Sequence, residues 1–406
     1  MWTLFKIAWR NCWRSRTRTL IVISSIVVGI WGSLAFMGFM DGLMNQRLQS
    51  AIDNTWSDIQ IQSQTYAFDK DISNDVSGLD KVLALLEKDT QVVAYTDRFE
   101  TEALVQTARE QRGAKILGVN ASREKRTLQL ADKVIDGEFF GEQYTRPALI
   151  GKKMAENLNV EVGSKILVTF TNLDSSQVAE NYRVSGIYQS GNTAYDEYNI
   201  FVPKKSIIKL TGVNMAHQIM VKTKLHSNVD SVKTELQSKI PHGNIVNTWR
   251  DSDPMLAYGA DMYDTMLLVI MVIIIAGLLF GIINTIVMSI LERKREIGVL
   301  LAVGMKPLKI KLMIAAESMY YGLVGGPVGV LLGFLFITYF HYNGLDLSNY
   351  SEGMMEYGLD PIIYFDLPVR YYFIYGGLIT LAAFLGGLYP ARIATKQNPI
   401  DSLRSI

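Results

Sequence analysis

The chain contains four long apolar runs separated by polar or charged segments. A helix needs about 20 mostly apolar residues to cross the hydrocarbon core of a bilayer, which is ~30 Å thick. The runs that meet this requirement lie at residues 20–40, 263–291, 312–340 and 371–389. The hydrophobic pattern therefore predicts four transmembrane helices.

The long polar stretch between the first two runs, residues 41–262, contains shorter periodic segments. "DIQIQSQ" (58–64) alternates like a strand, whereas "GLDKVLALLEKD" (78–89) has helical spacing. Further strands are predicted at 113–120, 165–172, 218–224 and 244–249, with a helix in 227–240 and a strand, helix and strand across 148–166. The predicted fold class is an α-helical integral membrane protein with four transmembrane helices and a large mixed α/β extracytoplasmic domain inserted between helices 1 and 2.

Lysine and arginine lie beside some ends of the apolar runs, while the connection between the third and fourth runs is mainly acidic. Basic flanking segments stay in the cytoplasm. The expected organisation is a cytoplasmic basic amphipathic segment (1–19), spans at 20–40, 263–291, 312–340 and 371–389, an outer α/β domain (41–262), a cytoplasmic connection (292–311), an outer loop (341–370) and a cytoplasmic tail (390–406). Both termini are thus expected on the cytoplasmic side.

The first apolar run is longer than the core of a secretory signal peptide, about 7–15 residues, so we expect an uncleaved signal anchor. The segment before it has Trp2, Phe5, Trp9 and Trp13 near one helical face and basic residues opposite. Two readings stay open for this segment. It either lies in the headgroup plane with its aromatic side chains inward, or it simply flanks the first span.

The composition argues against several functions. Lys and Arg number 40 against 39 Asp and Glu, a balance that does not favour a nucleic-acid binder. The sequence contains no phosphate-binding G-x-x-x-x-G-K-[ST] loop and no H-E-x-x-H motif, and one cysteine cannot form an intrachain disulfide. The histidines, His217, His226, His242 and His341, are scattered and expected to be ordinary surface residues. We therefore expect no catalytic, metal or cofactor site on this chain.

The third run contains the glycine-rich segment "GLVGGPVGVLLGF" (322–334). Small residues four apart allow another helix to approach closely in lipid. Pro327 removes a backbone hydrogen bond and favours a kink. The overlapping pairs involve Gly322, Gly325, Gly326, Gly329 and Gly333. They serve either helix packing within the chain or a subunit interface.

Glu317 is an acidic residue inside the same run. Ionisable residues within a membrane are costly and often functional, as in proton relays. Glu317 is close to the expected cytoplasmic end, near Lys309 and Lys311. Snorkelling or pairing with a base is therefore the less costly explanation.

The run "ERKREIGVLLAVGMKPLKIKLMIAAESMYYGLVGGPVGVLLG" (292–333) resembles the signature of the FtsX-like permease family, which includes MacB-type exporters and the lipoprotein-releasing LolC and LolE permeases. The signature starts with Glu-Arg-x-x-Glu-Ile-Gly, here at 292–298, and continues through Gly304, Glu317 and the glycine-rich helix. The ending "LYPARIATKQNPIDSLR" (388–404) and the outer segments "ALIGKKMAENLNVEVGSKI" and "YRVSGIY" also resemble the family.

The resemblance implies a non-catalytic permease subunit of an ABC transporter in a bacterial inner membrane, with a MacB-like periplasmic core. Its implied partners are a second protomer, in a homo- or heterodimer, and a cytoplasmic ABC ATPase that holds ATP and Mg²⁺, so no cofactor is expected here. The implied ATPase-coupling residues are Glu292, Arg293, Arg295, Glu296, Ile297, Gly298, Leu300, Leu301 and Gly304. In this reading the charged side chains contact the ATPase, and Leu300 and Leu301 enter a groove in it.

Within the family, "FMGFMDGLMNQRLQSAI" (36–52) and "NTWRDSDPMLAYGADMYDTMLLVIMVII" (247–274) resemble the lipoprotein-releasing branch. The resemblance implies a cavity for lipid chains at the outer ends of spans 1 and 2, where flexible Met side chains would suit an adaptable apolar site. Its candidate residues are Phe36, Met37, Met40, Leu43, Met44, Met262, Met266 and Leu267. The alternative is that these residues pack a dimer.

The expected function is mechanotransmission from cytoplasmic ATP hydrolysis to the periplasmic side, releasing lipoproteins or moving another amphipathic substrate. MacB-type efflux of a peptide, antibiotic or toxin is one alternative. A non-transporting FtsX-like signal transducer acting on periplasmic cell-wall hydrolases is another. The connection "TNLDSSQVAEN" (171–181) is short and polar where one branch member has a long chaperone-binding hook, so docking of a chaperone by such a hook is not expected.

Overall fold

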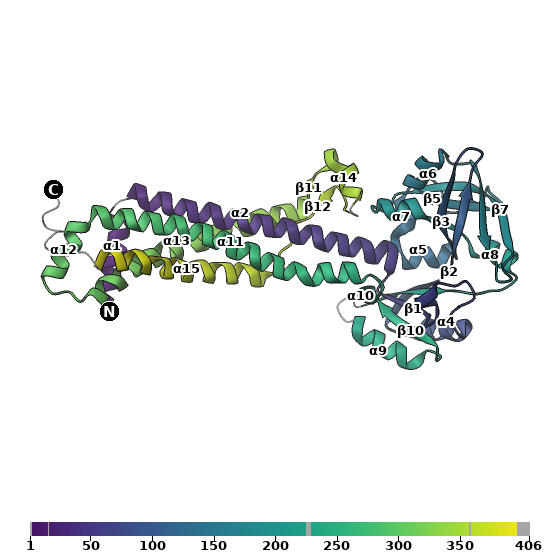
Figure 1. Cartoon of the computed structure of the whole chain (residues 1–406), viewed down its shortest axis with the longest axis horizontal. Coiled ribbons are helices and arrows are strands. Elements are labelled where there is room, and N and C mark those ends of the chain that lie inside the picture. Colours follow the sequence, from purple (N-terminus) through teal and green to yellow (C-terminus); the bar gives the residue numbers. More distant parts are fainter. Residues whose placement is uncertain (1, 15, 225–228, 357–358, 396–406) are drawn as a thin grey trace. The chain divides into compact units, whose positions relative to one another are not determined.

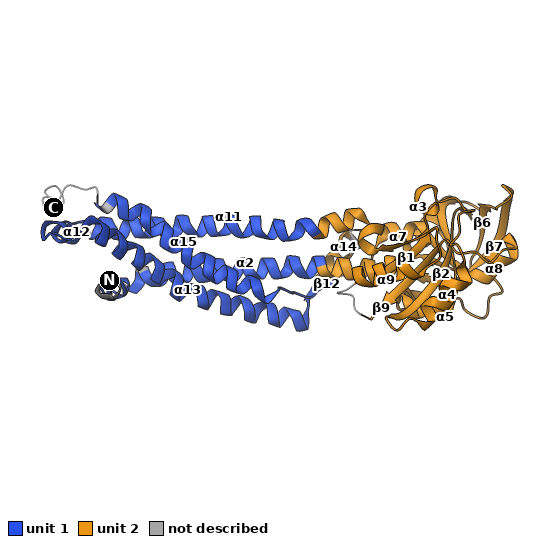
Figure 2. Ribbon diagram, turned by 90° about the horizontal axis from the view of Figure 1, so that it is seen from below, with its two compact units in different colours: residues 1–44, 261–346, 362–406 blue, residues 45–260, 347–361 orange. Residues whose placement is uncertain are grey.

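The computed structural model describes residues 2–14, 16–224, 229–356 and 359–395 (Figure 1). They belong to two compact units (Figure 2). The helical unit takes its described residues from 1–44, 261–346 and 362–406, and the sheet unit takes them from 45–260 and 347–361. His226 and the end of the family motif, from Lys396 to Arg404, lie outside the described residues.

The helical unit contains the long apolar helices that the sequence pattern predicts. Four helices of the described chain are long and apolar enough to cross a membrane. The helices along this part of the chain are α1 (Trp2–Cys12), α2 (Arg16–Ala51), α11 (Pro254–Glu292), α12 (Lys294–Ala302), α13 (Pro307–Asn343) and α15 (Val369–Thr395), and short strands β11 (Leu345–Asp346) and β12 (Ile362–Ile363) pair with each other.

These helices are longer than the apolar runs. α2 continues past residue 40 to Ala51, where a π-helix (Ile52–Trp56) follows, and α11 already begins at Pro254. An apolar run marks only the part of a helix that lipid requires, whereas the helix continues until its backbone hydrogen bonds are interrupted. Pro327 lies inside α13 and Pro390 inside α15 without ending either helix.

The glycine-rich face of α13 packs against helices of the same chain. A Cβ built on Gly325, Gly329 or Gly333 would lie 2.7–2.9 Å from a side chain of α2. One built on Gly322 or Gly326 would meet α15 at 3.1 and 3.5 Å. All five glycines therefore lie at helix–helix contacts within the chain.

The sheet unit is a mixed α/β structure, as predicted. Its strands are β1 (Ile59–Ser63), β2 (Val92–Gln106), β3 (Gln111–Val119), β4 (Val134–Gly137), β5 (Pro147–Gly151), β6 (Lys165–Thr171), β7 (Gln177–Tyr188), β8 (Asn199–Pro203), β9 (Gln218–Thr223) and β10 (Asn244–Thr248). Its helices are α3 (Tyr66–Asp69), α4 (Leu79–Lys88), α5 (Ala121–Thr127), α6 (Lys152–Leu158), α7 (Thr193–Tyr198), α8 (Lys204–Thr211), α9 (Val229–Lys239), α10 (Trp249–Ser252) and α14 (Ser351–Glu356), with 3₁₀ turns at Gln129–Lys133 and Ser348–Tyr350. The segments predicted from periodicity match β1, α4, β3, β5, α6, β6, β9, α9 and β10.

The strands pair in the order β10-β1-β9-β2-β3-β8-β5-β7-β4, with β6 joined to β2 and β7. The β3–β8 and β5–β7 pairs are parallel, and the other pairs of this sheet are antiparallel. The long strand β2 pairs with β9 through its first half and with β3 and β6 through its second. β2 therefore joins the two halves of the sheet.

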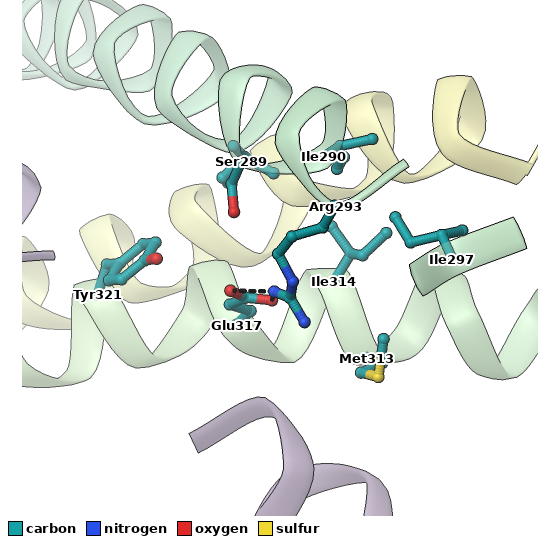
Figure 3. A pocket seen from close by; sticks show the side chains of 9 residues that line it. Ser289, Ile290, Arg293, Ile297, Met313, Ile314, Glu317 and Tyr321 are labelled. Atoms are coloured by element: carbon teal, nitrogen blue, oxygen red, sulfur yellow. Dashed lines mark hydrogen bonds and ion pairs between the residues drawn. The ribbon is translucent and has the colours of Figure 1, made fainter. Parts of the chain in front are cut away.

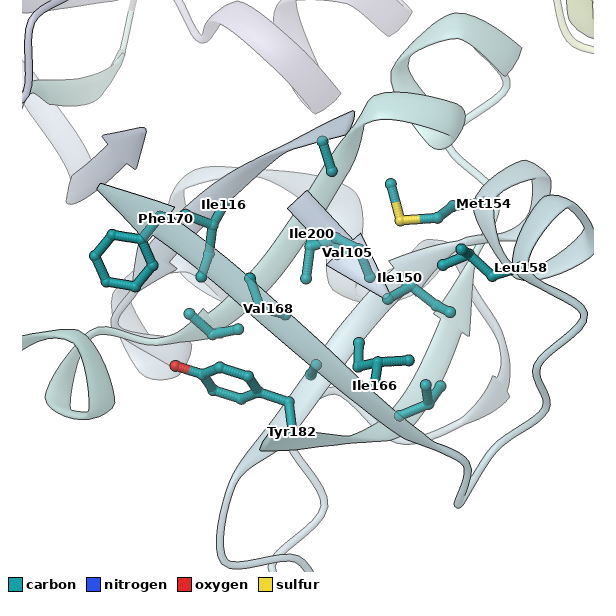
Figure 4. Close-up of a cluster of buried hydrophobic side chains, with 14 of the residues drawn as sticks. Val105, Ile116, Ile150, Met154, Leu158, Ile166, Val168, Phe170, Tyr182 and Ile200 are labelled. Carbon is teal, nitrogen blue, oxygen red and sulfur yellow. The ribbon is translucent and has the colours of Figure 1, made fainter. Parts of the chain in front are cut away.

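Each half of the sheet has its own apolar core. One core, around Ile61, includes Val82 from α4 and Leu236 from α9. The second half has apolar clusters on both faces: the one drawn in Figure 4 includes Ile116, Val168 and residues of α6, and the other includes Leu117, Leu149 and Phe201. Successive residues of a strand point to opposite faces, so neighbours such as Ile116 and Leu117 enter different clusters.

Candidate functional site

The charged connection between α11 and α13 folds into the short helix α12. α11 ends at Glu292, and Arg293 occupies the break before α12 starts at Lys294. After α12, Gly304 adopts a left-handed conformation with φ of 91°, and the amide of Met305 donates to the carbonyl of Leu300 at 3.0 Å. A glycine adopts this conformation without strain, which is why the chain can turn here into α13.

The side chains of α12 divide between the chain interior and the surface. Ile297 and Gly298 are buried, Leu301 is half-buried, and Leu300 packs against a small cluster of Ala8, Met313 and Ala316. The predicted insertion of Leu300 into an ATPase groove therefore competes with packing inside the chain. Residues of this connection with exposed side chains include Glu292, Arg295, Val299, Val303 and Leu308.

Arg293 and Glu317 form an ion pair beside α12 (Figure 3). Nη1 of Arg293 lies 3.2 and 3.4 Å from the two carboxylate oxygens of Glu317. The pair borders a small pocket that Ile290, Ile297 and Ile314 also line. Pairing with a base, the less costly explanation predicted for Glu317, is thus what the structure contains, and the base is Arg293.

Two further residues continue this ion pair toward the surface. Nε of Arg293 donates to Glu296 at 3.2 Å, and Nη1 of Arg14 donates to the other oxygen of Glu296 at 2.7 Å. Burial opposes ionisation of Glu296, but hydrogen bonds from Arg293 and Arg14 outweigh it and lower the pKa of this carboxyl. Sequence reasoning missed Arg14, which is one of several bases in the amino-terminal segment.

The amino-terminal helix α1 lies against α13. Ala8 is fully buried, and the ring of Trp9 contacts Tyr320 edge-on with centroids 5.2 Å apart. The thiol of Cys12 donates to the backbone carbonyl of Glu317 at 3.5 Å, and burial raises the pKa of this thiol to about 12. Trp13 remains exposed, as do the basic residues of α1. α1 thus combines contact with α13 and an aromatic, basic outer surface.

The candidate lipid-cavity residues are distributed between buried and exposed positions. Met37 and Leu267 are fully enclosed by the chain. Met40, Leu43 and Met44 are half-buried, while Phe36, Met262 and Met266 are exposed. The exposed members lie on α2 and α11, so an apolar surface is available on both helices.

The segment after β12 packs on the second half of α2, a contact that sequence reasoning missed. The rings of Phe39 and Phe365 lie 5.5 Å apart, and the amide of Asp366 donates to the carbonyl of Gly38 at 3.2 Å. A Cβ on Gly42 would lie 2.1 Å from the carbonyl oxygen of Tyr364, so glycine is required for this approach. Nothing in the local sequence pattern indicates it.

One histidine differs from the expectation of surface residues, whereas His242 and His341 are exposed as expected. His217 is fully buried, accepts the amide of Glu100 at Nδ1 and lies 2.9 Å from the carbonyl oxygen of Ile72 at Nε2. Desolvation by burial lowers its pKa. The surface expectation was therefore wrong for His217, which directly precedes β9 and packs against the rings of Tyr66 and Phe99. Among the described residues, no group of His, Cys, Asp or Glu has an arrangement that could hold a metal ion.

Charged residues inside the sheet unit are also paired. The buried Arg98 donates through Nε to Glu124 at 3.1 Å, and Thr96 donates to the same carboxylate at 2.9 Å. Asp97 accepts from Arg123 at 2.8 Å and also pairs with Lys204. These pairs join β2 to the helices α5 and α8. The buried Arg98, Asp97 and Lys204 therefore each have a partner of opposite charge, as buried ions require.

Two family descriptions match the chain. The FtsX-like permease C-terminal domain matches residues 268–399, and the MacB-like periplasmic core domain matches residues 19–239. The latter match covers more than half of the chain, and together the two extend across both units.

Curated relatives include lipoprotein-releasing system transmembrane proteins LolC. The chain is 25% identical over 335 residues to LolC of Xylella fastidiosa, covering 79% of this chain and 80% of that protein. It is 23% identical over 406 residues to LolC of Neisseria meningitidis serogroup B, covering 95% of this chain and 94% of that protein. It is also 23% identical over 415 residues to the macrolide export ATP-binding/permease protein MacB of Wolinella succinogenes, covering 98% of this chain and 60% of that protein.

Among solved structures, the periplasmic region of MacB from Actinobacillus actinomycetemcomitans covers 50% of this chain and 93% of that chain, with a TM-score of 0.35 and 13% identity. The family matches agree with the apolar helices and the mixed α/β unit. The chain belongs to the FtsX-like family of ABC transporter permeases that carry a MacB-like periplasmic core domain.

Proposed function

We propose that this chain is the permease subunit of an ABC system in a bacterial inner membrane that releases lipoproteins from the periplasmic face. A separate cytoplasmic ATPase hydrolyses ATP and binds at α12, and a second protomer completes the transporter. Both termini are cytoplasmic, and the sheet unit is periplasmic. The chain itself performs no catalysis and holds no cofactor.

The observation that carries this proposal is the helix α12 between two membrane-length helices. Its exposed side chains, Arg295, Val299 and Val303, offer a cation beside apolar surface. Such a combination suits docking of another protein, in which apolar contact supplies affinity and charge supplies orientation. Because Arg293 pairs within the chain, Arg295 is the better candidate for an ATPase contact.

Lipoprotein release is favoured over other substrates by the relatives named LolC, one of which aligns along nearly the whole chain. The exposed Phe36, Met262 and Met266 support it, because flexible apolar side chains suit an acyl chain. Depletion of the protein should leave lipoproteins in the inner membrane. Normal lipoprotein sorting after depletion would contradict the proposal.

Efflux is the second candidate, since a relative named macrolide export protein MacB aligns with 98% of this chain. Altered tolerance to macrolides or peptides after depletion, with normal lipoprotein sorting, would favour it. The β6–β7 connection does not distinguish the two candidates. It is a tight hairpin in which Thr171 pairs with Gln177, so we propose that no chaperone docks there by a hook.

ATPase binding is tested by co-expressing the affinity-tagged chain with an ABC ATPase encoded beside it. Arg295→Glu should lower the amount of co-purified ATPase at least about tenfold, a change equal to ~1.4 kcal/mol. Lys205→Glu reverses an exposed charge on α8 and is the matched control, for which no loss is expected. Equal retention by Arg295→Glu and the wild type would remove α12 as the docking element.

A further inference from the structure

Arg293 occupies the corner between α11 and α12, and its guanidinium holds a carboxylate of a third helix, α13. We propose that the Arg293–Glu317 pair is the joint that passes movement of α12 to α13, and that Arg293 is a positioning residue and not a contact for the ATPase. This inference rests on the proposed function, since it takes α12 as the element on which the ATPase acts.

The ion pairs at the two ends of this network differ in exposure. The side chains of Glu317, Arg293, Glu296 and Arg14 are 8%, 21%, 44% and 65% exposed, in order along the chain of ion pairs. An exposed ion pair is weak because water and salt screen it, whereas separating a buried pair leaves a charge without solvation. The Arg293–Glu317 link is therefore the persistent one, and the Arg14–Glu296 link is the one that opens readily.

Apolar packing alone would not fix α12. Ile297 and Leu300 bury apolar surface against the helical unit, but apolar contact is non-directional and permits a short helix to slide or rotate. The guanidinium of Arg293 contacts both oxygens of Glu317, and charge-assisted hydrogen bonds of this kind are directional. The Arg293–Glu317 pair therefore fixes the position of α12 relative to α13.

The exposed ion pair of the network, Arg14–Glu296, connects α12 to a different part of the chain. Glu296 accepts from Arg14, which lies between α1 and α2, so this pair ties α12 to the amino-terminal segment. A docking ATPase can displace Arg14 from Glu296 with little loss, since the pair is largely solvated. The buried joint remains closed while the exposed link opens.

The position of α12 is tested by electron spin resonance distances in the full chain with Cys12→Ser. Spin labels replace Val299 on α12 and Leu323 on α13, both exposed positions. We expect a narrow distance distribution in the wild type, a distribution at least twice as wide in Glu317→Gln, and near-normal width in Glu317→Asp, which keeps the charge. A distribution unchanged in Glu317→Gln would overturn the joint.

A double-mutant cycle separates the pair from two independent effects. If Arg293 and Glu317 act together, Arg293→Gln combined with Glu317→Gln should widen the distribution no more than Glu317→Gln alone. Additive widening would mean that the two side chains act through different partners, and would refute the proposal. Because both substitutions remove charge, the double variant leaves no buried ion without a partner.

Transmission is tested with the co-purified ATPase complex in proteoliposomes. Labels at Leu268 on α11 and Tyr339 on α13, both exposed, report movement in the halves of these helices that are remote from α12. ATP should shift this distance in the wild type. Glu317→Gln should retain the ATPase within about twofold while losing the ATP-dependent shift. Arg295→Glu should show the reverse pattern, with less ATPase bound and the α12 distance preserved.

These outcomes keep the two proposals apart. If the wild-type chain retains no ABC ATPase, the proposed function fails. If the wild-type complex responds to ATP and Glu317→Gln responds equally, the function stands and the joint alone is refuted. Loss of ATPase binding in Glu317→Gln to the same degree as in Arg295→Glu would also refute it, since the pair would then belong to the docking surface.

Discussion

Gly329 of α13 faces Ile30 of α2 so closely that a Cβ on the glycine would lie 2.8 Å from the Cβ of Ile30. The same relationship recurs one turn away on each side, between Gly325 and Ile26 and between Gly333 and Leu34. Residue numbers rise together along both helices, so α2 and α13 run in the same direction. Glycines four residues apart on α13 thus contact residues four apart on α2. Small residues at this spacing allow two helices to approach closely in lipid.

Gly329→Ala should therefore destabilise the helical unit by about 1–3 kcal/mol, because the added methyl group overpacks the contact with Ile30. Gly281→Ala on α11 is the matched control. A Cβ at Gly281 meets no atom of the described chain within 4 Å, so its substitution should be neutral or slightly stabilising. Thermal unfolding in detergent measures both. Equal melting temperatures for the two variants would contradict the close packing.

His217→Phe should destabilise the sheet unit by roughly 2–4 kcal/mol. The aromatic ring keeps the stacking on Tyr66, but the amide of Glu100 and the carbonyl of Ile72 lose their partner inside the protein. His242→Phe changes an exposed histidine and should stay within about 0.5 kcal/mol of the wild type. Chemical denaturation of the full chain compares them.

His217 should also lower the unfolding free energy of the protein as the pH falls. Burial lowers the pKa of His217 in the folded state, so the unfolded chain binds its proton more readily. Its contribution is present above the unfolded pKa, about 6.5, and is lost as the pH falls below that value. The difference in unfolding free energy between the wild type and His217→Phe should therefore shrink between pH 7 and pH 5. A constant difference would count against a buried neutral histidine.

Asp196 should have the opposite effect. Burial raises its pKa to about 7 from 3.8, although Ser190 donates to it through the backbone amide and, at 2.6 Å, through the hydroxyl. The folded state then holds the proton more tightly than the unfolded state, so stability is greatest below pH ~4 and is lost as the pH rises to about 7. The unfolding free energy lost through this titration is on the order of 4 kcal/mol.

Asp196→Asn removes this titration while keeping the side-chain shape. Its stability relative to the wild type should increase as the pH rises from 4 to 7 and then level off. Urea unfolding of the full chain across this range gives the comparison. If the relative stability did not change with pH, Asp196 would be ionised throughout in the folded protein.

Gly304→Ala should weaken the turn between α12 and α13 by ~1–2 kcal/mol. The residue has φ of 91° and no atom within 4 Å of a built Cβ, so the cost is backbone strain and not crowding. Gly304→Asn should cost less, because asparagine tolerates positive φ better than alanine. Melting temperature and the α12 label distance report the effect. An asparagine variant less stable than the alanine variant would argue against strain.

The sequence by itself identified the elements whose causes are local. Apolar runs long enough for a bilayer correspond to α2, α11, α13 and α15. Periodic segments of the polar stretch correspond to β1, β3, β5, β6, β9 and β10, but the pattern did not predict β2, the strand that joins the two halves of the sheet. The charged connection folds into α12, which is followed by Gly304 and Pro307, because a left-handed glycine and a proline are local stop signals for a helix. The family signature could also be recognised from the residues alone.

The tertiary structure decided which residues meet. Glu317 pairs with Arg293 and not with the lysines nearer in sequence, Arg14 reaches Glu296 across 282 positions, and His217 is buried. The glycines of α13 divide between α2 and α15, which the spacing of four could not reveal. Periodicity fixes only the face on which a side chain lies. Which residue a side chain contacts depends on how elements distant in the sequence pack together, because two side chains interact only when the fold brings them close in space.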